Sequence, residues 1–211
     1  MDGNARWATE RGLPVIEGHR EGARVLKRIV RRAGDFGIEE LTVYAFSTEN
    51  WTRPTAEVRA LMKLFAELLD TEVPELHEEG VRIRFIGRRD RITRGLRRRI
   101  DWSEDLTKDH TARTLFVAFD YGGRAEILEA AKRYDGGGEE AFRRRLYEPD
   151  MRDPDLVIRT SGEQRLSNFL LWQSAYSELY FSDRLWPDFD DDELERALAE
   201  YASRQRRFGA R

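Results

Sequence analysis

Three polar segments of the chain carry the residue types that bind phosphate groups. They span Ser47–Arg53, Asp120–Arg124 and Arg159–Ser167, and each follows a segment with the apolar pattern of a buried strand. Arginine guanidinium groups, serine hydroxyls and free backbone amides are the donors that phosphate oxygens accept. Because ligands bind at the carboxyl ends of parallel strands, the three segments predict one site for an anionic ligand.

The last of these segments has the most specific spacing. Arg159 and Arg165 flank a serine-glycine turn and can clamp a diphosphate from two sides, and Ser167 can donate a further hydrogen bond. The alternative is a surface turn whose arginines pair with Glu163 or Asp155. The position of the turn directly after a strand favours the diphosphate site.

Two carboxylates are candidate metal ligands. Asp2 precedes a glycine and Asn4, a pattern in which the carboxylate could hold Mg²⁺ while backbone N–H groups approach phosphate. A polar tail at the start of the chain would have the same composition. Glu178 lies in the apolar stretch 169–181, where a buried carboxylate needs a partner or a metal ion. Its alternative is a cap or an exposed place on a helix flank.

Composition excludes several other kinds of chemistry. The chain has no cysteine, which excludes a disulfide scaffold, a thiolate zinc site and a cysteine nucleophile. His19, His77 and His110 lack zinc-site spacing, and no serine-hydrolase, Walker A or Rossmann glycine motif is present. The 37 basic and 40 acidic residues leave a net charge of −3, which argues against binding nucleic acid through bulk charge. No apolar run is long enough to span a bilayer.

The rest of the sequence alternates between helical and strand patterns. Apolar periodicity predicts helices over 18–33, 54–76, 92–106, 125–134 and 191–204. It predicts strands over 41–47, 81–86, 114–119 and 155–159. This alternation predicts a single α/β domain over residues 1–211, with a mostly parallel central sheet flanked by helices.

Taken together, these motifs resemble the cis-prenyltransferases, also called the undecaprenyl diphosphate synthase or isoprenyl transferase family. The resemblance extends over nearly the whole chain, and its specificity comes from six blocks in the family's order. The blocks are Asp2–Trp7, Gly18–His19, Phe46–Pro54, Tyr121–Arg124, Asp155–Ser167 and Phe169–Glu178.

The resemblance implies an enzyme that condenses isopentenyl diphosphate with an allylic diphosphate such as farnesyl diphosphate, each new double bond being cis. The expected product is a (Z)-polyprenyl diphosphate, the precursor of a cell-wall or glycan lipid carrier. A homodimer is implied, with Mg²⁺ as the cofactor and a hydrophobic tunnel for the growing chain. The tunnel walls are expected to be the helix over 54–76 and the strand over 114–119.

A cytoplasmic location is also implied, with transient contact at the inner membrane face when the lipid product leaves. The alternative is a non-catalytic partner subunit of a heteromeric cis-prenyltransferase. Such subunits tend to lose the aspartate and the arginine-rich loop, whereas Asp2, Arg159, Arg165 and Ser167 are all present, which favours the enzyme.

The resemblance also implies roles for individual residues. Asp2 and Asn50 match the catalytic residues, while Asp2 and Glu178 match the metal ligands, Glu178 reaching across the dimer interface. Because a neutral amide is a poor base, we expect Asn50 to orient substrate or water while a diphosphate oxygen or a carboxylate takes the proton. The expected substrate-binding residues are Gly3, Asn4, Ala5, Arg6, Trp7, His19, Ser47, Thr48, Glu49, Trp51, Arg53, Arg159, Arg165, Leu166 and Ser167.

The sequence departs from the family pattern at a few points. Members carry a short apolar strand before the Asp-Gly-Asn motif, whereas this chain begins at the motif, so we expect the first strand to be missing and the natural start to lie upstream. Val15 stands where the family usually has arginine, which removes one expected substrate contact. Phe119 and Asp120 also differ from common members, and we expect them to alter the width of the tunnel.

Overall fold

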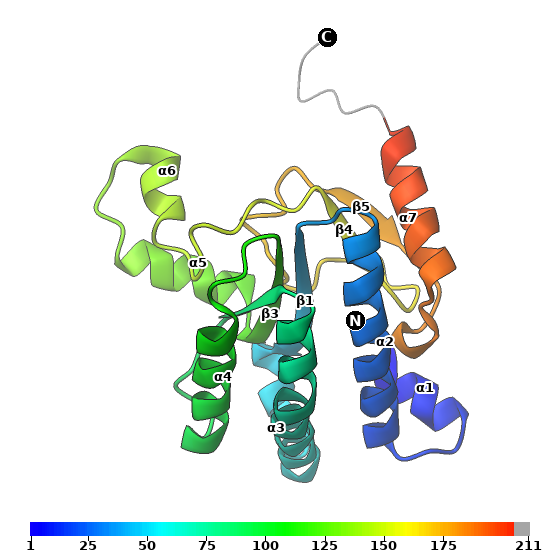
Figure 1. Cartoon of the computed structure of the whole chain (residues 1–211). Helices are drawn as coiled ribbons and strands as arrows, with labels where there is room; N and C mark the ends of the chain where they lie inside the picture. The colour runs from blue at the N-terminus through cyan, green and yellow to red at the C-terminus, as the bar shows by residue number, and fades with distance from the viewer. Residues whose placement is uncertain (205–211) are drawn as a thin grey trace.

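A computed structural model describes residues 1–204 (Figure 1). Its helices are α1 (Asn4–Glu10), α2 (Val15–Asp35), α3 (Thr55–Glu78), α4 (Arg94–Thr107), α5 (Gly123–Lys132), α6 (Gly138–Arg143) and α7 (Asp191–Ser203). Two short 3₁₀ helices are η1 (Thr48–Thr52) and η2 (Trp186–Asp188). The strands are β1 (Glu40–Ser47), β2 (Val81–Ile86), β3 (Arg113–Tyr121), β4 (Leu156–Arg159) and β5 (Glu178–Phe181).

The centre of the fold is a parallel sheet of three strands in the order β1-β3-β2. Successive residues of β3 point to opposite faces, as the pleat requires. Leu115, Val117 and Phe119 enter the apolar cluster that α3 and α4 also fill, while Phe116 and Ala118 enter a second cluster on the other face. Burial on both faces explains why β3 is a continuous apolar run rather than an alternating one.

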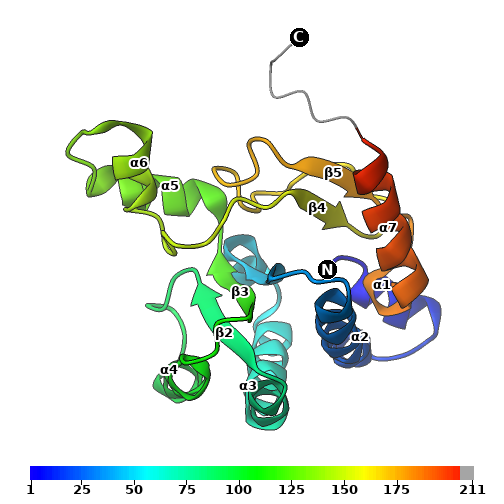
Figure 2. The ribbon, with the colours of Figure 1, turned by 45° about the horizontal axis from the view of Figure 1, so that its top comes forward.

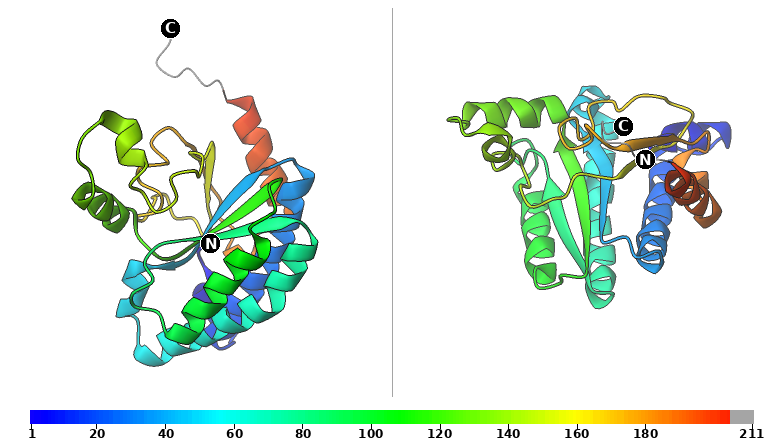
Figure 3. Two further views of the ribbon diagram at one scale, coloured as in Figure 1. Left: turned by 60° about the vertical axis from the view of Figure 1, so that its left-hand side comes forward. Right: turned by 90° about the horizontal axis from the view of Figure 1, so that it is seen from above.

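Strands β4 and β5 form a second parallel sheet, separate from the first. Figure 2 shows this pair beside α7 and apart from β1–β3. A third apolar cluster joins α2 to α7 through Val25, Ile29, Trp186, Phe189 and Leu194. Helices α5 and α6 lie on the opposite side of the molecule from α7, as Figures 1 and 3 both show.

The predicted α/β architecture, a parallel sheet flanked by helices, is confirmed. The separate two-stranded sheet was not predicted, because hydropathy patterns identify strands but not the edges that pair. Helix α1, strand β5 and helix α6 were also missed, since each has only four to seven residues. Pro54 is the N-cap of α3 rather than a residue of its first turn, and the helix continues through Pro74.

Candidate active site

The start of the chain is bonded to the end of β4. The Asp2 backbone N–H donates to Thr160 Oγ1 at 2.9 Å, and the Thr160 side chain also lies 2.9 Å from the Asp2 carbonyl oxygen. Arg159 Nη2 donates to Asp2 Oδ2 at 3.0 Å, and the Gly3 N–H donates to Asp2 Oδ1 at 2.9 Å. The structure therefore brings together Asp2 and Arg159, which the sequence placed in one site.

Two glycines of α2 allow this first segment to lie close to the helix. A Cβ atom at Gly18 would stand 2.0 Å from the Asn4 carbonyl oxygen, and one at Gly22 would stand 2.2 Å from Asn4 Oδ1. A larger residue at Gly18 would have to move the backbone of the segment that carries Asp2, and one at Gly22 would have to move the side chains of Asn4 and Trp186. Asn4 Oδ1 is buried and has no hydrogen-bond partner.

The loop after β4 is shaped by Arg159. Its Nη1 donates to Ser167 Oγ at 2.7 Å and also to the Arg165 carbonyl oxygen, so the loop curls around the guanidinium group. Ser161 and Ser167 have φ angles of 76° and 47°, in the left-handed region that most side chains disfavour. The buried Ser161 hydroxyl has no hydrogen-bond partner. Strained backbone and unmet polar atoms are typical of a binding site.

Glu163 in this loop pairs with arginines, as the alternative interpretation expected. It lies 3.6 Å from Arg6 and in closer contact with Arg165. Arg159 instead pairs with Asp2, so the two arginines of the loop have different partners. Arg165 has a side chain that is 61% exposed. An exposed guanidinium can leave its pair for a phosphate at small cost, because an exposed ion pair contributes little free energy.

The η1 turn is held by its own side chains. Asn50 Oδ1 accepts from the Ser47 N–H at 3.0 Å and forms a capping box with Ser47. Arg53 lies 3.1 Å from Glu57. The amide of Asn50 is thus oriented by the backbone of its own turn.

Asn168 is a residue that the sequence analysis missed. Its Nδ2 donates to Glu49 Oε1 at 2.8 Å, while its Oδ1 accepts from the Arg124 N–H and its carbonyl oxygen from the Gly123 N–H, both at 2.8 Å. It therefore joins all three polar segments. Its φ of 67° explains the residue type, because asparagine tolerates the left-handed region better than most residues. No periodicity in the sequence marks such a position.

His19 projects from α2 into the same region. Burial, and next the positive charge of Arg53, lower the pKa of His19 to about 4, so the imidazole is neutral at pH 7. Its Nε2 atom is buried without a hydrogen-bond partner. A neutral imidazole with a free nitrogen can bind an incoming polar group.

These elements surround a cavity of about 1030 Å³. Its polar rim includes twelve of the predicted site residues, namely Asp2, Gly3, Asn4, Ala5, Arg6, His19, Ser47, Asn50, Arg53, Arg159, Arg165 and Ser167. Leu166 also lines it. Helix α3 contributes Leu61, Met62 and Phe65 to its apolar wall. From β3, only Phe119 lines the cavity, because β1 lies between β3 and the open space, so most of the predicted strand wall is supplied by β1 instead.

Five predicted residues do not line the cavity, namely Trp7, Thr48, Glu49, Trp51 and Glu178. Trp7 Nε1 donates to Asp188 Oδ1 at 2.7 Å, and Glu178 accepts from Arg204 at 2.7 Å. Glu178 is in register with Leu156 at the start of β4, whereas Asp2 contacts the end of that strand. Three residues of strand separate the two ends by about 10 Å. One chain does not bring the two predicted metal ligands together.

Within residues 1–204 no group of three or more histidine or acidic side chains could hold a metal ion by itself. Over the same range no helix has the length and apolar character needed to cross a membrane.

Known proteins of similar sequence and fold identify the family of the chain. Residues 1–209 match the family described as "Putative undecaprenyl diphosphate synthase". The isoprenyl transferase of Thermotoga maritima is 51% identical, over 99% of this chain and 94% of that protein. The isoprenyl transferase of Clostridium perfringens is 48% identical, over 99% of this chain and 87% of that protein.

Two solved structures are also similar. Lavandulyl diphosphate synthase from Lavandula x intermedia, in complex with dimethylallyl diphosphate, has a TM-score of 0.94 at 38% identity, covering 99% of this chain and 95% of the other. A probable undecaprenyl diphosphate synthase from Campylobacter jejuni has a TM-score of 0.83 at 36% identity, covering 90% and 92%. Nothing in these similarities supports a non-catalytic partner subunit. The chain belongs to the undecaprenyl diphosphate synthase family and is a cis-prenyltransferase.

Proposed function

We propose that the protein condenses isopentenyl diphosphate with an allylic diphosphate of the farnesyl type and releases a longer (Z)-polyprenyl diphosphate. The single observation that carries this proposal is the bonded pair of Asp2 and Arg159 at the rim of a large apolar cavity. The rim supplies the charges and donors that a diphosphate needs, and the cavity supplies the apolar walls that a prenyl chain needs.

Asp2 is the residue that would hold Mg²⁺. Magnesium sites commonly use one or two carboxylates together with substrate phosphates, so a lone aspartate beside a diphosphate pocket fits this ion. When bound, the ion would offset the negative charge that gathers on the departing diphosphate. The side chain of Asp2 is 47% exposed, and each of its oxygens retains a free lone pair after accepting from Gly3 and Arg159.

Arginine and serine side chains of the rim would bind the diphosphate oxygens. Arg159 is 13% exposed and held on three sides, so it presents a fixed guanidinium group. Arg165 and Arg53 would exchange their glutamate partners for phosphate. Preorganised donors of this kind stabilise charge that develops as the allylic C–O bond breaks.

The apolar wall would protect the carbon fragment. As the diphosphate departs, the allylic carbon becomes cation-like and would react with water. Leu61, Phe65 and Phe119 face the cavity and exclude water from the reacting carbons. The same wall would accept the growing chain, and its bulk would set product length.

Asn50 would orient the substrate rather than take the proton. Its Oδ1 is occupied by the Ser47 N–H, and the residue lines the cavity, so its Nδ2 group is the one that would donate to a ligand there. The proton released from the condensing isopentenyl unit would pass to a diphosphate oxygen, which is a better base than an amide.

Glu178 would act from a second copy of the chain. It lies away from Asp2 within one chain, so a role as a metal ligand requires a homodimer in which the partner subunit presents it. The apolar product is suited to a lipid carrier precursor, and its release requires transient contact with a membrane surface.

Incubation with radiolabelled isopentenyl diphosphate, farnesyl diphosphate and Mg²⁺ tests the proposal. We expect butanol-extractable products longer than the primer, with cis geometry by ¹³C NMR and no incorporation in EDTA. Dimethylallyl and geranyl diphosphate should be tried as further primers. Absence of incorporation with all three primers would refute the function. Sedimentation of the same sample would test the dimer.

A further inference from the structure

Asp120 is a fully buried carboxylate for which the proposed mechanism has no role. Its side chain is 0% exposed, and it adopts a φ of 50° at the end of β3. The strand alternation breaks at this residue. Phe119 packs in the cluster under α3 and α4, whereas Tyr121, two positions further, joins the cluster on the opposite face. A left-handed residue at Asp120 produces this change of face.

The carboxylate receives donors from two other elements. Trp51 of η1 donates its indole N–H to Oδ1 at 2.8 Å. Arg91, in the loop between β2 and α4, donates Nε to Oδ2 at 3.0 Å and Nη2 to Oδ1. In the same loop, the Arg88 N–H donates to the Asp120 carbonyl oxygen at 3.1 Å. Asp120 therefore joins three segments at the carboxyl end of the sheet.

Trp51 is firmly placed by these neighbours. The Arg91 guanidinium carbon lies 5.3 Å from the centre of its ring, and Phe46 meets the ring edge-on with centroids 5.3 Å apart. Trp51 does not line the cavity, but Asn50 and Arg53 on either side of it in the sequence do. Trp51 thus ties the η1 turn to Asp120 at a point between two residues that line the cavity.

We propose that Asp120 is a positioning residue for prenyl transfer, acting through its hydrogen bond to Trp51 to hold the η1 turn at the cavity rim. This inference rests on the proposed function above. It predicts that loss of the acceptor lowers kcat, because the substrate is misplaced, while the diphosphate site around Asp2 and Arg159 is left intact.

Five variants separate this role from a purely structural one. Asp120→Ala removes the acceptor, and Trp51→Phe removes the donor but leaves the pair of Asp120 with Arg91. The double variant completes a cycle. Asp120→Asn can keep Oδ1 for Trp51 and Arg91 Nη2, but it replaces the acceptor of Arg91 Nε with an N–H₂ donor. The control is Glu104→Gln, which alters another arginine-carboxylate pair whose hydrogen-bond partners, Phe85 and Arg89, lie outside η1.

We expect Asp120→Ala and Trp51→Phe each to lower kcat about tenfold, with inhibition by inorganic pyrophosphate unchanged. The double variant should be no slower than the slower single variant, because both single variants remove the same hydrogen bond.

Fluorescence gives a second readout. The wild-type spectrum minus that of Trp51→Phe isolates one of the five tryptophans, and Asp120→Ala should shift that component whereas Asp120→Asn and Glu104→Gln should not.

If the losses of kcat caused by Asp120→Ala and Trp51→Phe add up in the double variant, the proposal is overturned. A Trp51 emission unchanged by Asp120→Ala, or a kcat loss equal to that of Glu104→Gln, would also overturn it. If Asp120→Ala does not fold, Asp120→Asn decides, since a tenfold loss of kcat in a variant that keeps the acceptor contradicts the inference. If wild-type protein transfers no prenyl groups, the proposed function fails, but the fluorescence comparison still tests whether Asp120 holds Trp51.

Discussion

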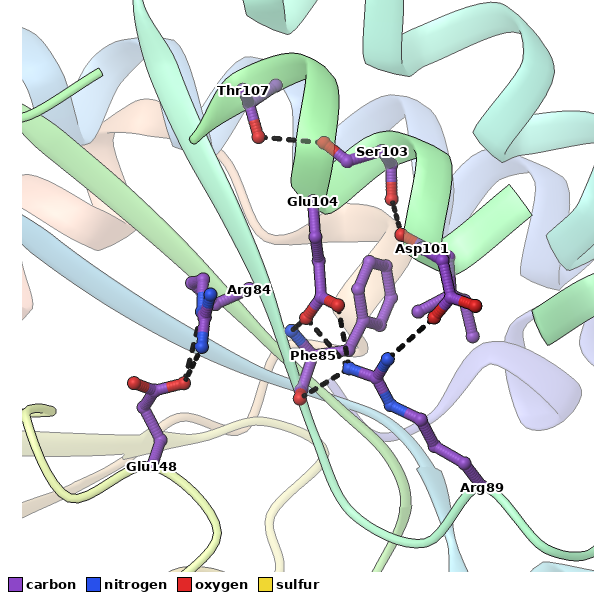
Figure 4. A network of polar contacts seen from close by, with 9 residues as sticks. Arg84, Phe85, Arg89, Asp101, Ser103, Glu104, Thr107 and Glu148 are labelled. Carbon is purple, nitrogen blue, oxygen red and sulfur yellow. Dashed lines mark hydrogen bonds and ion pairs between the residues drawn. The ribbon is translucent and has the colours of Figure 1, made fainter. Parts of the chain in front are cut away.

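The two outer edges of the three-stranded sheet differ in what lies beside them and in how the backbone N–H groups of the edge strand are hydrogen-bonded. Along β2, side chains of α4 take up two N–H groups of the strand, and Figure 4 shows the one of Phe85 beside Glu104. The Ile83 N–H donates to Thr107 Oγ1 at 3.0 Å and the Phe85 N–H donates to Glu104 Oε1 at 2.8 Å. Arg89 Nη2 then donates to the same Glu104 carboxylate at 2.8 Å. This edge is closed to further pairing, as stable proteins require of exposed edges.

The edge formed by β1 is different: at its end the Ser47 N–H donates to Asn50 Oδ1 at 3.0 Å. It pairs with β3 on one side only, and on the other it borders the cavity that β4 also lines. The cavity is lined by Ser167 and Leu170, which have positive φ angles, and by Asn4 and His19, which carry unmet polar atoms. Polar side-chain atoms without partners and left-handed backbone together are typical of a binding site.

The largest effect is expected from Asp2→Ala, at the cavity that borders β1. Loss of the carboxylate should lower kcat on the order of a thousandfold, because charge stabilisation at the departing diphosphate is lost. The melting temperature should change little, since Asp2 is held chiefly through its backbone by Thr160 and Trp186. Steady-state kinetics and thermal melting measure the two quantities.

The matched control for that variant is Asp70→Ala on the side of the closed edge. Asp70 is 51% exposed and pairs with Arg99 at 2.8 Å. Exposed pairs contribute little free energy, so activity and melting temperature should both stay near the wild-type values. Near-normal turnover in Asp2→Ala would show that Asp2 has no role in the mechanism. The two variants would then not differ in activity.

A second effect concerns the pH dependence of stability. The folded-state pKa of His19 is about 4, below its ordinary value of 6.5, so the unfolded chain binds the proton more readily. Above pH 6.5 the imidazole is neutral in both states and costs nothing. As the pH falls from 6.5 toward 4, only the unfolded state gains a proton, and stability should fall by about 2 kcal/mol.

Urea denaturation of wild-type protein and His19→Asn at pH 7 and pH 4.5 isolates this term. Carboxylates titrate equally in both proteins, so between pH 7 and pH 4.5 the wild-type protein should lose about 2 kcal/mol more stability than His19→Asn. A difference in stability between the two proteins that stays constant with pH would show that His19 is not held neutral by burial. His19 would then not present a neutral imidazole to the cavity.

A third, smaller effect is expected from Asn168→Gly. Glycine adopts the φ of 67° without strain, so stability should change little, while the links from Glu49 to Arg124 through the side chain are lost. We expect kcat to fall about tenfold from misplacement of the polar segments. Asn168→Asp is the comparison, because it keeps the acceptor for the Arg124 N–H but sets a carboxylate against Glu49. It should lose more activity than glycine, and the reverse order would contradict the role of the amide.

Much of the site around the cavity could be predicted from the sequence. The strand-end rule placed three segments in one site. Parts of Ser47–Arg53 and Arg159–Ser167 line the cavity, whereas no residue of Asp120–Arg124 does. The periodicity of α3 was read correctly because Leu61, Phe65 and Leu68 repeat at helical spacing over a long element. Long, regular elements carry their pattern in the sequence itself.

What could not be predicted depends on contacts between distant residues. Asn168 and Asp120 act through donors far away in the chain, and their left-handed backbone leaves no periodic signal. The wall assigned to β3 was largely supplied by β1, because strand order is not encoded in the hydropathy of either strand. The closing of the β2 edge by Glu104 is likewise a tertiary feature.

The smallest effect is expected at the closed edge itself, from Glu104→Gln. The side chain of Glu104 is 16% exposed and satisfies both the Phe85 N–H and Arg89. Glutamine keeps one acceptor and loses the charge, so the free energy of unfolding should fall by about 1 kcal/mol. Because this edge serves the fold and not the site, kcat and the KM values should stay at wild-type levels. Denaturant titration and kinetics on one preparation measure both, and a loss of activity larger than the loss of stability explains would show that the two edges are coupled.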